Sequence, residues 1–163
     1  MTSNLLQRID DAIEQTNKGE YLPALSAFIE IYGTEDAPPL TTAKAASGLS
    51  YFGLCLALIE KKYKAAIELC KRAVALQFYN PDHWVNLTRV YAAAGHRRKA
   101  LDAVETGLKQ HPDYEPLVAI RHTLGVRARP PVPFLDRSHP INVTLGQARH
   151  AKKIAETEGR RRK

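Results

Sequence analysis

Six histidines and two cysteines are the side chains of this 163-residue sequence best suited to catalysis or metal binding. None of the histidines has a metal-binding spacing with Cys, Asp or Glu. His83 and His96 flank one predicted helix, and we expect both on the surface. We find no Ser-His-Asp order, Gly-rich phosphate loop or carboxylate pair. The sequence therefore predicts no catalytic residue, no metal or cofactor site and no enzymatic activity.

The two cysteines are expected to be structural. Cys55 and Cys70 lie within predicted helices and lack CxxC spacing, which favours free thiols in a reducing compartment over a disulfide or metal site. No apolar run reaches the roughly 18 residues of a membrane span. The first 15 residues show no secretory signal. We therefore expect a cytoplasmic protein.

Basic residues are concentrated at the C-terminal end. Residues 1–120 hold 13 Lys/Arg and 14 Asp/Glu, whereas residues 121–163 hold 11 Lys/Arg and 3 Asp/Glu. The last four residues are all basic: Arg160, Arg161, Arg162 and Lys163. Such a run can contact nucleic acid or an anionic membrane by releasing counterions. No aromatic residue stands nearby to stack on bases, so a solubilising tail remains the alternative.

Apolar residues at helical spacing predict six helices before residue 112. Their ranges are about 3–18, 21–32, 41 or 42–61, 63–77, 81–94 and 97–110. A seventh helix is expected after Pro112, because Leu117, Ile120 and Leu124 recur at intervals of three and four. One polar face on this helix would let it cap the others.

The stretch from Pro81 to Asp113 carries a spaced motif. Trp84, Leu87 and Tyr91 fall on one predicted helix, and the next helix carries Ala100 and Val104, followed by Pro112. This pattern resembles a tetratricopeptide repeat. Thr88 replaces the usual Gly, Val104 the usual Phe, and Gly107 a position that is commonly Ala, which we expect to loosen the packing. The resemblance implies that Trp84, Leu87, Tyr91 and Ala100 are buried between the two helices.

Earlier copies of the motif are less regular. The preceding 34 residues align through Tyr63, Ala66 and Cys70, and Gly19, Ala24 and Phe28 mark a first copy. The resemblance to a small bacterial-type tetratricopeptide adaptor implies an all-α, right-handed superhelix of three helix pairs plus a capping helix. Residues 1–125 would form this domain, and residues 126–163 a proline-containing, basic C-terminal segment.

In that family, ligands contact the concave face, at positions between the packing residues of each first helix. The corresponding residues here are Ser50, Leu54, Ala57, Val85, Asn86, Arg89 and Ala93. The amide of Asn86 can hydrogen-bond a peptide backbone, and Arg89 can bind a carboxylate. Some members bind chaperones through Lys, Asn and Arg from three helices. No Lys partner is evident here, which argues against that arrangement.

The resemblance implies a non-catalytic adaptor or scaffold that holds a peptide segment of another protein in its concave groove. The alternative is a polyanion-associated factor that contacts nucleic acid or membrane through Arg160–Lys163. Residues 131–148 combine prolines with apolar side chains, including Val132, Phe134 and Leu135. We expect this stretch to pack on the repeats, because a solvated linker would be more polar.

Overall fold

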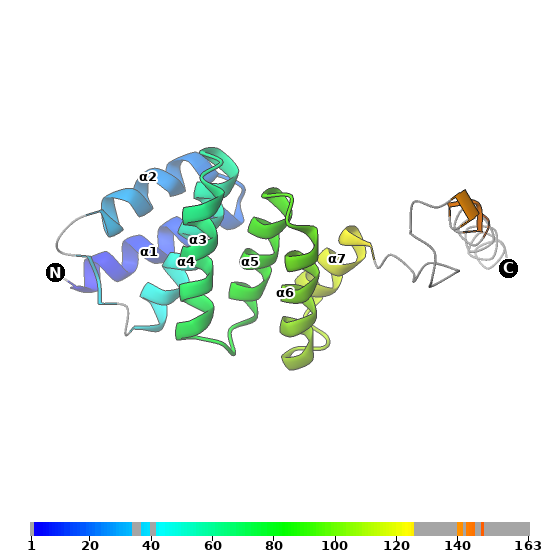
Figure 1. The fold of residues 1–163 in the computed structure, drawn as a ribbon. Helices are drawn as coiled ribbons and strands as arrows, with labels where there is room; N and C mark the ends of the chain where they lie inside the picture. The colour runs from blue at the N-terminus through cyan, green and yellow to red at the C-terminus, as the bar shows by residue number, and fades with distance from the viewer. Residues whose placement is uncertain are drawn as a thin grey trace, which may run out of the picture. The chain divides into compact units, whose positions relative to one another are not determined.

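The computed structural model describes residues 2–33, 37–39, 42–125, 140–141, 143–145 and 148. Its first 125 residues form one compact unit that contains seven helices in the described part (Figure 1). They are α1 (Thr2–Asn17), α2 (Tyr21–Tyr32), α3 (Ala43–Ile59), α4 (Tyr63–Leu76), α5 (Pro81–Ala93), α6 (Arg97–Gln110) and α7 (Glu115–Leu124). The predicted helices are confirmed, with ends that move by at most two residues.

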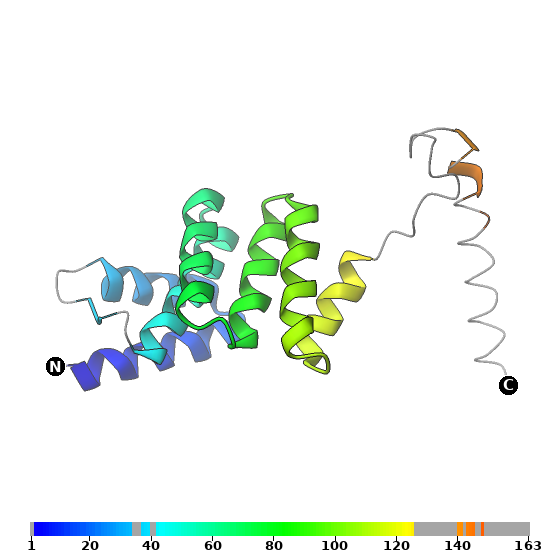
Figure 2. The same cartoon turned by 60° about the horizontal axis from the view of Figure 1, so that its bottom comes forward.

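Consecutive helices pack as three pairs, α1 with α2, α3 with α4 and α5 with α6, and α7 packs on the last pair. The first helix of each pair also contacts the next first helix, so α1, α3, α5 and α7 form one row. In both views α4, α5, α6 and α7 follow one another along the unit (Figures 1 and 2). The predicted all-α superhelix of three helix pairs and a capping helix is therefore confirmed.

Local sequence explains where the helices of the third pair begin and end. Asn80 caps α5, because its side-chain oxygen accepts a hydrogen bond of 3.0 Å from the backbone N–H of Asp82. Pro81 follows at the first helical position, where the missing N–H costs nothing. Gly95 takes a φ of +75° in the turn to α6, a conformation that side chains with a Cβ disfavour.

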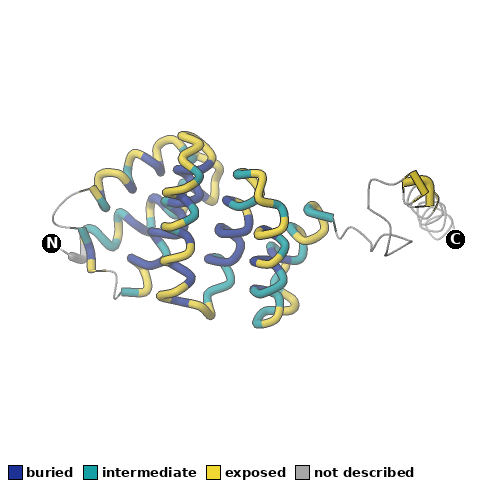
Figure 3. The backbone as a smooth tube through the Cα atoms, viewed as in Figure 1, coloured by how far each residue is buried: buried dark blue, intermediate teal, exposed yellow. Residues whose placement is uncertain are grey.

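Trp84 is buried in the first half of α5, a helix that Figure 3 shows with a largely buried stretch. A Cβ placed on Gly107 of α6 would lie 2.9 Å from the Cβ of Trp84 and 2.8 Å from Leu117 of α7. The expectation that Gly107 loosens the packing is therefore wrong, because the absent side chain lets α6 approach closely. The indole Nε1 donates a 2.8 Å hydrogen bond to the backbone oxygen of Phe78.

The other expected packing residues are buried to different extents. Leu87 and Ala100 are buried as predicted, whereas Tyr91 is only half-buried, with Lys99 above its ring. Thr88 is completely buried, and its hydroxyl has no hydrogen-bond partner within the described part of the chain. The equivalent Gly53 in the second pair lies against α4, where a Cβ would meet the sulfur of Cys70 at 2.7 Å. The glycine of the repeat motif therefore lets the two helices of the second pair approach closely, whereas the third pair has Thr88 at this position.

An aromatic cluster joins the first pair to the second, across the irregular connection between α2 and α3. The rings of Tyr32 and Phe52 stack with centroids 5.9 Å apart, and Phe28 packs beside both. The Tyr32 hydroxyl donates a 2.8 Å hydrogen bond to the backbone oxygen of Ala45 at the start of α3. These side-chain contacts therefore hold the first helix pair against the second.

Residues 126–163 form a second compact unit. Residues 140–141, 143–145 and 148 of this unit are helical, and the side chains of Ile141 and Leu145 are partly exposed. The basic run Arg160–Lys163 lies outside the described residues, as does most of the stretch 131–148. Polyanion contact by the run and docking of the stretch on the repeats both stay predictions.

Replacing Trp84 with Ala is expected to lower the free energy of unfolding by about 3–5 kcal/mol, the usual cost of removing a buried aromatic side chain. Trp84→Phe keeps most of the apolar contact and loses the hydrogen bond to Phe78, so its cost should be smaller. Denaturant melts of the full chain measure both. A loss below about 1 kcal/mol for Trp84→Ala would contradict the central place of this side chain.

Candidate binding groove

A pocket of about 500 Å³ opens where α1, α3 and the turn between α4 and α5 meet. It lies along the row of first helices, and it combines charged, hydroxyl-bearing and apolar side chains. The lining residues are Asp10, Ile13, Ala43, Lys44, Ser47, Tyr51, Gln77, Tyr79, Asn80, Pro81 and Asp82. A mixed lining of this kind suits a segment that offers both apolar and hydrogen-bonding groups.

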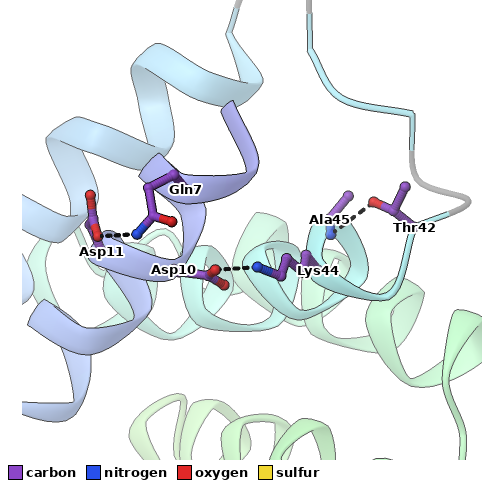
Figure 4. A network of polar contacts seen from close by, with 6 residues as sticks. All are labelled: Gln7, Asp10, Asp11, Thr42, Lys44 and Ala45. Carbon is purple, nitrogen blue, oxygen red and sulfur yellow. Dashed lines mark hydrogen bonds and ion pairs between the residues drawn. The ribbon is translucent and has the colours of Figure 1, made fainter. Parts of the chain in front are cut away.

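An ion pair crosses one edge of this pocket. The ammonium of Lys44 on α3 donates to the carboxylate of Asp10 on α1 (Figure 4). Thr42 begins α3 beside it, because its hydroxyl accepts a 3.3 Å hydrogen bond from the backbone N–H of Ala45 (Figure 4). Since Lys44 and Asp10 are 52% and 39% exposed, their pair adds little stability and can open for a ligand.

Two tyrosine hydroxyls stand near the start of α5. Tyr114 donates a 2.5 Å hydrogen bond to the carboxylate of Asp82. Burial raises the pKa of Tyr114, and the hydrogen bond to Asp82 raises it further. Burial also raises the pKa of Tyr51, with a further contribution from the negative charge of Asp82. Both phenols therefore keep their protons at neutral pH and serve as hydrogen-bond donors.

His83 was predicted to lie on the surface, and this prediction is wrong because the residue is buried behind the pocket residue Ser47. Its side chain is completely buried, with Nδ1 3.1 Å from the backbone oxygen of Ala73 and Nε2 3.3 Å from the hydroxyl of Ser47. The ring therefore links α5 to both α3 and α4. His96 is exposed, as predicted.

The predicted groove residues divide into two sets. Arg89 and Ala93 on α5 are exposed. The other five are buried, with at most 5% of each side chain exposed: Ser50, Leu54, Ala57, Val85 and Asn86. A peptide contact at any of the seven stays a prediction.

The burial of the five has a physical reason in the contact between α3 and α5. The amide nitrogen of Asn86 on α5 donates a 3.1 Å hydrogen bond to the hydroxyl of Ser50 on α3. Helical spacing predicts which residues lie on the inner side of each helix, but not how closely the neighbouring helix covers them.

Helical periodicity alone does not single out the residues that line the pocket, yet the sequence holds a weak signal for two of them. Ser47 and Asp82 each stand two residues before a packing residue, Leu49 in α3 and Trp84 in α5. They therefore occupy equivalent places in two repeats. The partnership of Lys44 with Asp10 has no such signal, because the two residues lie on different helix pairs.

The remaining His, Cys, Asp and Glu side chains do not gather into a metal site in the described part of the chain. No three His, Cys, Asp or Glu residues gather there in a way that would hold a metal ion. Cys55 and Cys70 are free and buried, and burial raises the pKa of both thiols. In the same residues, no helix has the length and apolar character to cross a membrane.

Comparison with known proteins agrees with this architecture. Residues 57–121 match the family model described as tetratricopeptide repeat. Among solved structures, the chain is similar to the second TPR domain of the human RPAP3 protein, in complex with the HSP70 peptide SGPTIEEVD. The TM-score is 0.57 at 16% identity, and the match covers 76% of this chain and 98% of that one. No curated protein matches the chain.

Asn86→Ala is expected to lower the free energy of unfolding by about 1–3 kcal/mol, because it removes a buried hydrogen bond and leaves a gap beside Ser50. Arg89→Ala, one turn further along the same helix, should change it by no more than about 0.5 kcal/mol, since the side chain is exposed. Chemical denaturation compares the two variants. Equal effects would contradict the structural role of Asn86.

Folding stability is also expected to fall as the pH drops below about 6.5, where the unfolded chain protonates His83. Burial lowers the pKa of His83 in the folded state, so the unfolded state binds the proton more readily. Denaturant melts between neutral and mildly acidic pH test this. His83→Gln should flatten the dependence, whereas His96→Gln at an exposed site should keep it.

Proposed function

We propose that this chain, whose residues 57–121 match the tetratricopeptide repeat model and whose fold is similar to that of a tetratricopeptide domain, is a non-catalytic adaptor. It would hold a peptide segment of a partner in its inner groove. The pocket at the row of first helices is the observation that carries this proposal. A helical row with a preformed pocket can order a flexible segment without rearranging itself. Tetratricopeptide repeats typically serve as interaction modules, and the described residues offer no metal-binding cluster.

The pocket chemistry indicates how such a segment would be held. The hydroxyl of Ser47 donates to Nε2 of His83, whose Nδ1 bonds the Ala73 carbonyl, so it can accept a hydrogen bond from a backbone N–H of the segment. The hydroxyl of Tyr51 can donate to a backbone carbonyl group, and the side chains of Ile13 and Pro81 can contact an apolar residue. Arg89 lies further along α5, and its positive charge offsets part of the rise that burial causes in the pKa of Tyr51. The bound segment would therefore extend from the pocket along α5.

The groove differs from a site for an acidic peptide. The RPAP3 domain was solved with a peptide whose last residues are EEVD. In this chain Asn86 is committed to Ser50, and Lys44 is paired with Asp10. Asp82 places a further carboxylate in the lining. We infer that the pocket itself favours a neutral or basic part of the segment, whereas the exposed Arg89 further along α5 can bind a carboxylate of the same segment.

A variant that fills the pocket tests the proposal. Peptides selected against the full-length protein from a random library provide the probe. Ala43→Trp adds bulk at an exposed position of the pocket lining, and Ala119→Trp adds the same bulk on α7. We expect Ala43→Trp and Arg89→Glu each to weaken binding about tenfold or more, and Ala119→Trp to leave the Kd unchanged.

Circular dichroism melts establish that the three variants remain folded. Binding that survives both Ala43→Trp and Arg89→Glu would place the peptide on another surface and refute the groove proposal. Selection of mostly acidic peptides would refute the inferred preference while leaving the groove itself in place.

A further inference from the structure

Two adjoining depressions follow the outer side of α4. The first, of about 720 Å³, lies at the turn that starts the helix, and the second, of about 770 Å³, continues along it. Ala65 and Glu68 line both, so the two form one trough. The trough runs from Lys61 to Ala75, and its helical part from Tyr63 to Ala75 measures about 18 Å at 1.5 Å per residue.

The floor of this trough is apolar. It contains Phe52 and Leu56 of α3 together with Leu69 of α4. Phe52 is held in place by the rings of Phe28 and Tyr32. In the described part of the chain α2 and α4 both pack on α3 but not on each other, which leaves the floor accessible between them.

The rim of the trough is basic. Its cationic side chains outnumber the nearby carboxylates of Glu60 and Glu68 by five to two: Lys61, Lys62, Lys64, Lys71 and Arg72. Glu60 pairs with Lys62 at 2.6 Å, and Glu68 with Lys71 at 3.2 Å. Among the described residues, the other three cations have no ion-pair partner.

The trough and the inner pocket lie on opposite sides of α3. Ser47 lines the pocket and Leu56 lines the trough. Nine helical residues separate them, which at about 100° per residue places their side chains half a turn apart. A ligand in the trough therefore leaves the inner pocket accessible.

We propose that this trough binds an acidic amphipathic helix from a partner protein. The apolar residues of one helical face, spaced at three and four, would lie on Phe52 and Leu69, and flanking Glu or Asp would reach Lys64 and Arg72. The helical part of the trough matches the length of about three helical turns. Residues 126–163 carry 10 Lys/Arg and 3 Asp/Glu, the same sign as the rim, which favours a separate protein as the source.

The apolar floor distinguishes this proposal from binding of a polyanion. Nucleic acid contacts a basic surface chiefly through its phosphates, which need cations but no apolar floor. An amphipathic helix uses both features at once, because burial of its apolar face supplies affinity and the charges set orientation and partner choice.

A designed peptide with Leu on one helical face and Glu elsewhere tests the proposal on the full-length protein. A matched peptide carries Lys in place of every Glu. We expect the acidic peptide to bind saturably, to weaken as salt is added, and to shift the NMR signals of Phe52 and Leu69. Lys64→Glu combined with Arg72→Glu should weaken binding about tenfold or more.

Three controls make the result decisive. Arg98→Glu with Lys109→Glu makes the same charge change at exposed positions of α6 and should leave the Kd unchanged. Neutralising the last four residues should also leave the NMR shifts of Phe52 and Leu69 unchanged. A single-stranded DNA oligonucleotide should not produce these shifts.

Four outcomes would overturn the proposal. They are equal binding of the Lys peptide, unchanged affinity after the Lys64 and Arg72 reversals, loss of binding when only the tail is neutralised, and the same Phe52 and Leu69 shifts with DNA.

Discussion

Packing of Trp84 is the interaction on which the rest of the helical unit depends. Its side chain contacts Gly107 of α6 and lies beside Leu117 of α7, while its indole N–H bonds the backbone of Phe78 before α5. Four successive segments therefore meet at one residue. Because each helix pair contacts only its neighbours, a contact that links several of them carries more of the cooperativity than any surface ion pair.

Polar residues on the inner face of the row of first helices hold the fold together. Asn86 and His83 lie on α5 among residues that could face a ligand, yet their polar atoms bond to Ser50, Ala73 and Ser47 within the protein. Buried polar groups need such partners, since an unpaired one is costly. On the inner face, the polar groups that stay available to the proposed segment therefore lie at the mouth of the pocket and on the exposed side of α5.

The two candidate surfaces differ in the sign of their charge. The inner pocket includes two carboxylates and one ammonium group, whereas the trough on α4 has three more cations than carboxylates. Opposite flanks of α3 line them, so α3 separates the two surfaces without joining them. An adaptor with this arrangement would hold partners of different charge at the same time, and neither would have to displace the other.

The sequence by itself determined the helices, their order and the burial of Trp84. The apolar periodicity, the Asn80 cap and the turn at Gly95 each depend on residues close together in the chain, so they can be recognised from the sequence. Only the tertiary structure decided that Asn86 is buried, that Gly107 tightens its contact, and that Lys44 meets Asp10. These outcomes depend on how closely helices from different pairs approach. That distance is set by the summed packing of side chains remote in sequence, which no local pattern records.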